Sequence, residues 1–421
     1  MMRTSDDAEV IIVGGGPAGA STAVALARAG VDVCVLDRAH FPRDKPCAEY
    51  MSPQAGRILE AMGALAAIDS AGGAQLEGML VRAPDGAQMH GDFAAQHGFR
   101  GFRDRGLALK RRVLDAILLE SARSAGTRIA EGVRVTGLGR DATGRVTGVV
   151  TLDPDGRRGV RRASLVIGAD GLRSVVARGL GVQRASRWPR RIAFVTHYRD
   201  VQGMGASGEM HVERTGYCGL ADVGGGETNV AVVVPQRAAA DAAGDAAGFL
   251  ERWIAATPHL AARFAHAART SPVRVTGPFA SAARRAWAPG AALVGDAADF
   301  FDPFTGEGIY AALRGGELLA PFALQAARAG GTHADAALAA YERARRAEFA
   351  GKWRVERLVG AAVSFPALMN RAARVLGRRK ELADLVVGVA GDFVPAREVL
   401  RPRFLLQFLK LAAEAGLPSA N

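Results

Sequence analysis

A glycine-rich turn near the start of the chain places the strongest constraint on its fold. Residues 9–13 predict a short buried strand, which leads directly into Gly14-Gly15-Gly16-Pro17-Ala18-Gly19. Residues 20–29 predict a helix that ends at Gly30, and residues 31–36 predict a second strand that ends at Asp37. This order of strand, glycine turn, helix, strand and acid is typical of a dinucleotide-binding βαβ unit.

The residue types in this segment each have a physical reason. We expect Gly14 to permit the tight turn, Gly16 to let a pyrophosphate approach the backbone, and Gly19 to let helix and strand pack closely. The helix start offers free amides to the phosphates, and Asp37 is placed to accept hydrogen bonds from ribose hydroxyls. The predicted nucleotide-binding residues are therefore Gly14, Gly16, Pro17, Ala18, Gly19, Asp37 and Arg38.

Two later segments extend this site. Arg111 stands just before a predicted helix over 113–125, where it is either a surface residue or a contact to the phosphate or ribityl region of a cofactor. Residues 164–171 predict another buried strand that ends in a small-residue turn. Its Asp170 and Gly171, followed by Ser174, suit a polar network near a pyrophosphate.

The last segment selects a flavin as the cofactor. Residues 291–296 predict a strand and turn, and residues 309–320 predict a helix. We expect Asp296 to accept from a ribityl hydroxyl, and the start of this helix to stabilise an anionic reduced flavin. The predicted flavin-binding residues here are Gly295, Asp296, Pro303, Gly306, Glu307, Gly308 and Ile309.

The sequence holds no second glycine fingerprint behind a strand. A dedicated nicotinamide domain is therefore not expected, and electrons would come from NAD(P)H that visits the site or from a reduced partner protein.

Charge and composition exclude several function classes. The net charge is +12, but the basic residues are dispersed and no nucleic-acid motif accompanies them. No apolar run approaches the 18 residues of a membrane span, and the three cysteines fit a reducing compartment. We expect a cytoplasmic protein without a metal site and without a signal peptide in residues 1–7. The basic C-terminal region is either a solvated helical surface or a contact with an anionic membrane.

Two segments carry a family resemblance. Lys45-Pro46-Cys47-Ala48-Glu49 and the stretch 296–309 resemble those of the para-hydroxybenzoate hydroxylase-like FAD-dependent oxidoreductases, and most of all the geranylgeranyl reductase branch. The resemblance covers the whole length. The chain departs from that branch at Ala48, where glycine is usual, and at Tyr217, which stands without the Trp, Phe and Pro that normally follow it.

The resemblance implies reduction of carbon–carbon double bonds in an isoprenoid or related lipid by hydride transfer from flavin N5. The alternative is a monooxygenase that hydroxylates a phenolic or polyketide-type substrate with NAD(P)H and O₂, and a third reading is a non-catalytic flavin-binding protein. A halogenase is disfavoured because the four tryptophans lie far apart.

The resemblance also assigns a substrate region. Residues 191–198, 208–213, 216–222 and 227–235 alternate like antiparallel strands, and such a sheet covers the flavin ring in this superfamily. We expect His197, Tyr198 and His211 to face the substrate, with Tyr217 and Cys47 as candidate proton donors. Because strand register is open, each sheet residue has packing on the other face as its alternative, and Cys47 has the alternative of a buried structural thiol.

These observations predict an α+β fold. A Rossmann-like FAD-binding domain of the glutathione reductase type would use residues 1–85, 100–182 and 275–330, interleaved with a substrate-binding sheet domain of residues 86–99 and 183–274. Residues 331–421 would form a helical C-terminal region, whose apolar segment 404–411 packs in the core or faces lipid.

Overall fold

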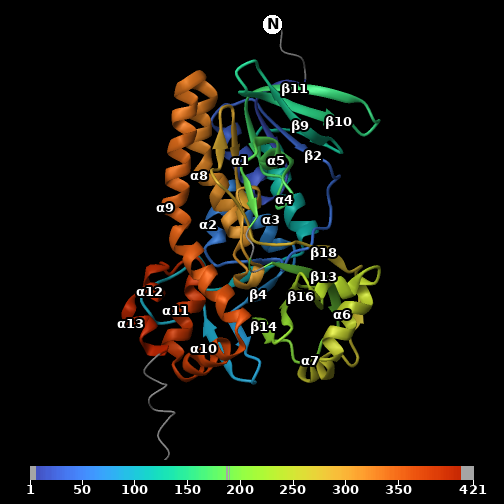
Figure 1. Ribbon diagram of the computed structural model, residues 1–421, viewed down its shortest axis with the longest axis vertical. Coiled ribbons are helices and arrows are strands. Elements are labelled where there is room, and N and C mark those ends of the chain that lie inside the picture. Colours follow the sequence, from blue (N-terminus) through green and yellow to red (C-terminus); the bar gives the residue numbers. More distant parts are fainter. Residues whose placement is uncertain (1–5, 186–187, 189, 409–421) are drawn as a thin grey trace, which may run out of the picture.

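The computed structural model describes residues 6–185, 188 and 190–408. Figure 1 shows a nucleotide-binding part and a second sheet at opposite ends of the molecule, with two long helices running along the side. Most of the segment 1–7 and the last three residues of the segment 404–411 lie outside the described residues.

A sheet built around parallel strands forms the core of the first part. β1 (Ala8–Val13) pairs in parallel with β2 (Val33–Asp37) on one side and with β11 (Arg158–Gly168) on the other, and β11 pairs in parallel with β21 (Ala291–Leu293). Their carboxyl ends therefore meet at one edge of the sheet, which is where α/β folds bind ligands. This pairing brings together the three predicted motifs that follow β1, β11 and β21.

Helices cover this sheet. α1 (Pro17–Arg28) packs against α8 (Gly308–Ala329) and α4 (Arg111–Ser124), and α9 (Gly331–Ser364) runs along α8. The sequence predicted the starts of α1, α4 and α8 to within three residues, but α8 runs nine residues beyond its predicted end at residue 320. It did not predict β9 (Arg134–Arg140) and β10 (Val146–Leu152), which extend β11 into an antiparallel ribbon at the top of Figure 1.

The second sheet is mostly antiparallel. Its strands follow the order β17-β13-β16-β15-β14-β5-β6 and comprise β17 (Ala268–Arg269), β13 (Arg191–Arg199), β16 (Glu227–Pro235), β15 (Gly216–Asp222), β14 (Ser207–Glu213), β5 (Gly78–Arg82) and β6 (Gln88–Asp92). The four predicted strands are present. The predicted boundary at residue 86 falls too late, because β5 pairs in parallel with β14 and already belongs to this sheet.

Helices cover both faces of the second sheet. α6 (Ala246–Ala255) and α7 (Pro258–Arg263) pack on one face, while α10 (Pro366–Arg378) and α11 (Lys380–Ala390) pack around β6 on the other side. The described C-terminal region is helical, as predicted. The remaining elements are β3 (Tyr50–Met51), α2 (Ala55–Met62), α3 (Leu65–Ser70), β4 (Ala74–Leu76), β7 (Gly106–Ala108), β8 (Arg128–Glu131), α5 (Val175–Leu180), β12 (Gln183–Ala185), η1 (Ala238–Ala242), β18 (Arg274–Thr276), β19 (Ser281–Ala283), β20 (Trp287–Ala288), η2 (Gly295–Ala297), β22 (Asp299–Phe300), η3 (Pro303–Thr305), α12 (Arg397–Leu400) and α13 (Pro402–Leu405).

Candidate active site

One long cavity joins the two parts of the molecule. It begins at Gly16, Pro17 and Ala18, passes Asp296 and the segment 305–309, and ends against the second sheet. Its empty volume is about 1760 Å³, open solvent included. Because its lining runs from the start of α1 to the second sheet, the cavity connects the predicted cofactor residues with the predicted substrate sheet.

Three of the four glycines of the first turn, Gly14, Gly16 and Gly19, have different surroundings. A Cβ on Gly19 would lie 1.9 Å from the carbonyl oxygen of Gly14, and a Cβ on Gly14, whose φ is +105°, would lie 2.5 Å from the oxygen of Ala169. Backbone atoms therefore leave no room for a side chain at Gly14 or Gly19. A Cβ on Gly16 would meet only guanidinium nitrogens of Arg43 and Arg111, at 3.8 and 3.9 Å. Gly16 therefore faces a cradle between the start of α1 and two cations, which fits a pyrophosphate.

Asp37 holds the glycine turn in place. Its carboxylate accepts a hydrogen bond from the Gly15 amide at 2.8 Å and another from the Ala39 amide at 2.9 Å. Asp37 is buried, whereas Arg38 beside it is exposed. The contact of Asp37 and Arg38 with a ribose stays a prediction.

Arg111 lies at the cavity wall and is not a surface residue. It is 4% exposed, and its Nε and Nη2 atoms each donate to the Asp115 carboxylate at 2.7 Å. Arg43 Nη1 lies 2.9 Å from the same carboxylate. Burial disfavours the charge of Arg111, but Asp115 and Cys47 together hold the pKa of Arg111 above its usual range. Two cations around one buried carboxylate leave a net positive charge beside Gly16.

Asp170 has a different role from the predicted one. Its carboxylate accepts from the Ser174 hydroxyl and from the Val175 amide, both at 2.6 Å, and so satisfies the start of α5. The predicted polar network exists, but it caps a helix. Gly171, with φ +77°, does line the cavity, and the Lys45 ammonium lies 3.6 Å from the place where its Cβ would stand.

Asp296 is the free carboxylate of the site. It follows β21, lines the cavity, and makes no hydrogen bond or ion pair with any of the described residues. Burial raises the pKa of Asp296, while Lys45 and Arg111 oppose that rise. Burial also lowers the pKa of Lys45, together with the charge of Arg111. Both residues line the cavity and stay half-buried, so Asp296 and Lys45 can bind a polar ligand such as the ribityl chain of a flavin.

The segment before α8 shapes the neighbouring part of the cavity. The Asp302 carboxylate accepts from the Phe304 amide at 3.1 Å, Gly306 adopts φ +73°, and α8 begins at Gly308. The first amides of α8 have no partner within the helix and carry its positive dipole end. Cavity-lining residues of this part are Pro303, Gly306, Glu307, Gly308, Ile309 and Gly295, whose contact with a flavin stays a prediction. The open cradle, the free carboxylate and this helix start together fit FAD.

Tyr217 lies on the cavity face of the second sheet. It is 1% exposed, its hydroxyl donates to Asp302 Oδ1 at 2.7 Å, and Asp302 in turn pairs with Arg191. Burial and the Asp302 charge raise the pKa of Tyr217 well above its usual value. The Tyr217 hydroxyl therefore stays protonated and donates a hydrogen bond to Asp302.

Tyr198 and His211 correct the prediction, because both lie on the other face of the sheet. The Tyr198 ring packs edge-on against Phe264 at 5.1 Å, and His211 bonds Glu209 at 2.7 Å and His259 at 3.2 Å. Successive side chains of a strand alternate between faces. The cavity face holds Ala193, Val195 and Met210, which puts Tyr198 and His211 toward α6 and α7.

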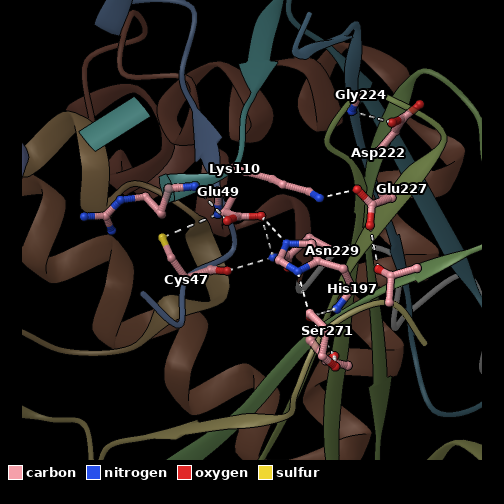
Figure 2. A network of polar contacts seen from close by, with 12 residues as sticks. Cys47, Glu49, Lys110, His197, Asp222, Gly224, Glu227, Asn229 and Ser271 are labelled. Carbon is pink, nitrogen blue, oxygen red and sulfur yellow. Dashed lines mark hydrogen bonds and ion pairs between the residues drawn. The ribbon is translucent and has the colours of Figure 1, made fainter. Parts of the chain in front are cut away.

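His197 lies on the cavity side but belongs to a buried polar network, shown in Figure 2. Its Nε2 lies 2.7 Å from Glu49 Oε2, and its Nδ1 lies 3.0 Å from the Ser271 hydroxyl. Asn229 donates both to the Cys47 carbonyl oxygen at 2.9 Å and to Glu49 at 3.0 Å. This network fastens the loop that carries Cys47 to the second sheet.

Glu49 and Asn229 are members of this network that the sequence reasoning did not single out. Glu49 is 3% exposed and adopts φ +61°, a conformation that is costly outside glycine. In the sequence, the sign that pointed to Glu49 was its place in the segment 45–49, in which Cys47 was the predicted functional residue. The Cys47 thiol itself lines the cavity beside Arg111 and accepts from the Glu49 amide at 3.4 Å.

Two further findings concern the described part of the chain. It contains no group of three or more His, Cys, Asp or Glu side chains arranged to hold a metal ion. Its helices are also too short or too polar to cross a membrane.

The site defines a flavoprotein, and comparison with known families agrees. Residues 7–352 match the family described as FAD binding domain, and the chain belongs to this family of FAD-dependent oxidoreductases. It is 31% identical over 246 residues to a menaquinone reductase of Mycobacterium tuberculosis, a match that covers 55% of this chain and 56% of that protein. The match thus spans only about half the length of that relative.

Two other similarities are longer. A menaquinone reductase of Mycolicibacterium smegmatis is 28% identical over 92% of both chains, and digeranylgeranylglycerophospholipid reductase 2 of Methanopyrus kandleri is 29% identical over 96% of this chain and 98% of its own. Among solved structures, a flavoprotein/dehydrogenase of Cytophaga hutchinsonii has a TM-score of 0.81 at 21% identity, covering 97% of this chain and 98% of that one. A flavin-dependent brominase has a TM-score of 0.80 at 19% identity, covering 97% and 99%. These structures confirm the fold.

Proposed function

We propose that this flavoprotein reduces carbon–carbon double bonds in an isoprenoid or related lipid. The observation that carries the proposal is the continuity of the cavity, which runs from the FAD-binding residues Gly16 and Asp296 to an apolar chamber under the second sheet. The named reductases that this chain resembles point in the same direction, because digeranylgeranylglycerophospholipid reductase is named for a prenylated lipid. NAD(P)H or a reduced partner protein would supply the electrons.

The chamber suits an apolar chain. Its wall under the sheet consists of Ala193, Val195, Met210, Gly219, Ala231, Val233 and Phe279. Small side chains leave the space open, and each Å² of apolar substrate surface buried there contributes about 25 cal/mol. The few polar groups then fix the orientation of the substrate, as is usual for such sites.

FAD supplies the hydride when it is bound, and the protein supplies the rest. The apolar wall holds the double bond and excludes water. The Tyr217 hydroxyl and the Asp302 carboxylate fix the segment before α8, and the Glu49 network fixes Cys47. The family resemblance offered Tyr217 and Cys47 as proton donors, but the Tyr217 proton is engaged by Asp302.

The test measures the mass of the product by mass spectrometry. The FAD-loaded protein is reduced with dithionite without oxygen, and a geranylgeranylated phospholipid is added in detergent. We expect a product that is heavier by two hydrogens. In a second reaction under ¹⁸O₂ with NAD(P)H, a labelled oxygen atom in the product would contradict the proposal and establish the alternative monooxygenase.

A variant of the chamber tests where the lipid binds. Ala231→Phe adds a ring to the cavity wall, so we expect at least about tenfold slower turnover, the equivalent of about 1.4 kcal/mol. Its FAD content should match the wild type. The control is Val232→Ile, on the other face of the same strand. Equal turnover in all three proteins would place the substrate elsewhere.

A further inference from the structure

Three carboxyl groups surround a single lysine at the cavity wall. Lys352 and Glu356 stand one turn apart on α9, Glu307 precedes α8, and Asp392 follows α11. Lys352 Nζ lies 2.9 Å from Glu307 Oε2 and also pairs with Asp392. The side chains of Glu307 and Asp392 are only 3% and 4% exposed. Separate segments of the chain therefore build one acidic cluster of Glu307, Lys352, Glu356 and Asp392, in which the Glu307 and Asp392 side chains are buried and Lys352 and Glu356 are half-buried.

One ammonium group does not balance three carboxylates in a buried place. Like charges that share such a site cannot all ionise, so protons stay on the cluster at neutral pH. Burial raises the pKa of Glu356 to about 7, with Lys352 opposing and Asp392 adding to the rise. Burial also raises the pKa of Glu307 well above its usual value, again against Lys352. Asp302 and Arg357 act on Glu356 from outside the cluster, with opposite signs.

Two polar atoms in and beside the cluster are candidates for binding ordered water or a ligand group. Asp392 Oδ2 and the hydroxyl of Tyr50 are buried without a hydrogen-bond partner in the described structure. Tyr50 is 5% exposed and lines the cavity, and the charges of Asp392 and Glu307 raise the pKa of Tyr50. Burial is again the larger cause of that rise. Such orphaned atoms normally hold ordered water or a ligand group.

Glu356 is the carboxyl group of the cluster that lines the cavity without a partner among the described residues. Its carboxyl group lines the cavity and makes no hydrogen bond or ion pair with the residues that the structure describes. Glu307 and Asp392, by contrast, are held by Lys352. Lys352 also lies 5.0 Å above the Tyr310 ring, which fixes the ammonium on that side.

We propose that Glu356 is the proton donor of the reduction, and that Glu307, Asp392 and Lys352 keep it supplied with protons. This role rests on the proposed function. One carbon of the double bond takes the hydride that reduced FAD supplies, and the other takes the proton of Glu356. The π bond breaks, two C–H bonds form, the flavin is oxidised, and Glu356 is left as a carboxylate that regains a proton from the cluster and from solvent.

The activity test uses Glu356→Gln, which keeps the size of the side chain but has no acidic proton. In a single anaerobic turnover we expect product formation to slow about 100-fold, the usual contribution of a general acid. FAD content and lipid binding should stay unchanged. Glu356→Asp, which keeps the acid on a shorter side chain, should recover part of the rate. The control is Glu348→Gln on the same helix, where Glu348 pairs with Arg314 away from the cluster.

A second readout needs no substrate. An infrared pH titration of the resting protein should show a protonated carboxyl group that ionises near pH 7 in the wild type and is missing in Glu356→Gln. Absence of that signal from the wild type would overturn the donor role.

The two proposals fail in different ways. A wild-type protein that reduces no lipid overturns the proposed function and the donor role with it. A wild type that is active beside an equally active Glu356→Gln protein overturns the donor role alone.

Discussion

At the scale of the residue, two aspartates in similar turns have different tasks. Asp170 and Asp296 both follow a glycine-containing turn at the carboxyl end of a parallel strand. The Asp170 carboxylate accepts a hydrogen bond at the start of α5, whereas the Asp296 carboxylate lines the cavity without a partner among the described residues. The difference comes from the residues after each turn, since Ser174 and Val175 offer donors to Asp170 within five residues.

This difference predicts opposite effects of two matched substitutions. Asp296→Ala should weaken FAD binding about 10- to 100-fold, since a hydrogen bond to a charged group contributes about 1.5–3 kcal/mol. Asp170→Ala should bind FAD normally but lose about 1 kcal/mol of stability with its cap. Flavin fluorescence titration and thermal unfolding measure both effects. Full FAD occupancy in Asp296→Ala would contradict the assignment.

At the scale of the element, the turn between β1 and α1 combines packing and binding. Gly14 and Gly19 let the helix start touch the strand end, and Gly316 in α8 lets that helix approach α1, where a Cβ would lie 2.8 Å from Ser21 Cβ. Such close packing aims the start of α1 into the cavity. Gly16 takes no part in it, since only the far ends of Arg43 and Arg111 approach its position.

Substitutions at Gly16 and Gly19 should distinguish an effect on FAD binding from an effect on folding. Gly16→Ala should fold with nearly unchanged stability but lose FAD, because the new methyl group occupies the cradle for the pyrophosphate. Gly19→Ala should fail to fold or lose several kcal/mol, on the order of 3 or more, because its Cβ meets backbone. Circular dichroism melting and flavin absorbance distinguish the two outcomes. A yellow Gly16→Ala protein, which retains FAD, would contradict the proposal that Gly16 lies against the pyrophosphate.

At the scale of the whole molecule, the C-terminal helix α9 lines the cavity and α11 packs on β6 of the second sheet. A Cβ on Gly91 in β6 would lie 2.5 Å from the Val387 side chain and 2.7 Å from the Ala383 carbonyl oxygen of α11. The Asp92 amide donates to the Asp384 carboxylate at 2.8 Å. The sheet and α11 therefore touch almost backbone to backbone, and Asp392, which follows α11, pairs with Lys352 of α9.

Gly91→Ala should loosen this contact. We expect a loss of about 1–3 kcal/mol, typical of overpacking, and faster amide hydrogen exchange in α10 and α11 with unchanged FAD affinity. Gly205→Ala is the control, because nothing lies within 4 Å of its Cβ position. Unchanged exchange in Gly91→Ala would show that α11 is held by other contacts.

The sequence alone determined the cofactor half of this protein. The glycine turn, Asp296 and the segment 303–309 are local patterns, and parallel pairing of β1, β11 and β21 brings them to one edge without further information. The tertiary structure decided the substrate half. Strand register placed the Tyr217 side chain in the cavity and the Tyr198 and His211 side chains on the opposite face of the sheet. Successive side chains of a strand point to opposite faces, and pairing with neighbouring strands decides which of the two faces the cavity. Long-range packing also paired β5 with β14 and gathered Glu307, Lys352, Glu356 and Asp392 from separate segments. No local pattern specifies such contacts, since they depend on how whole elements pack.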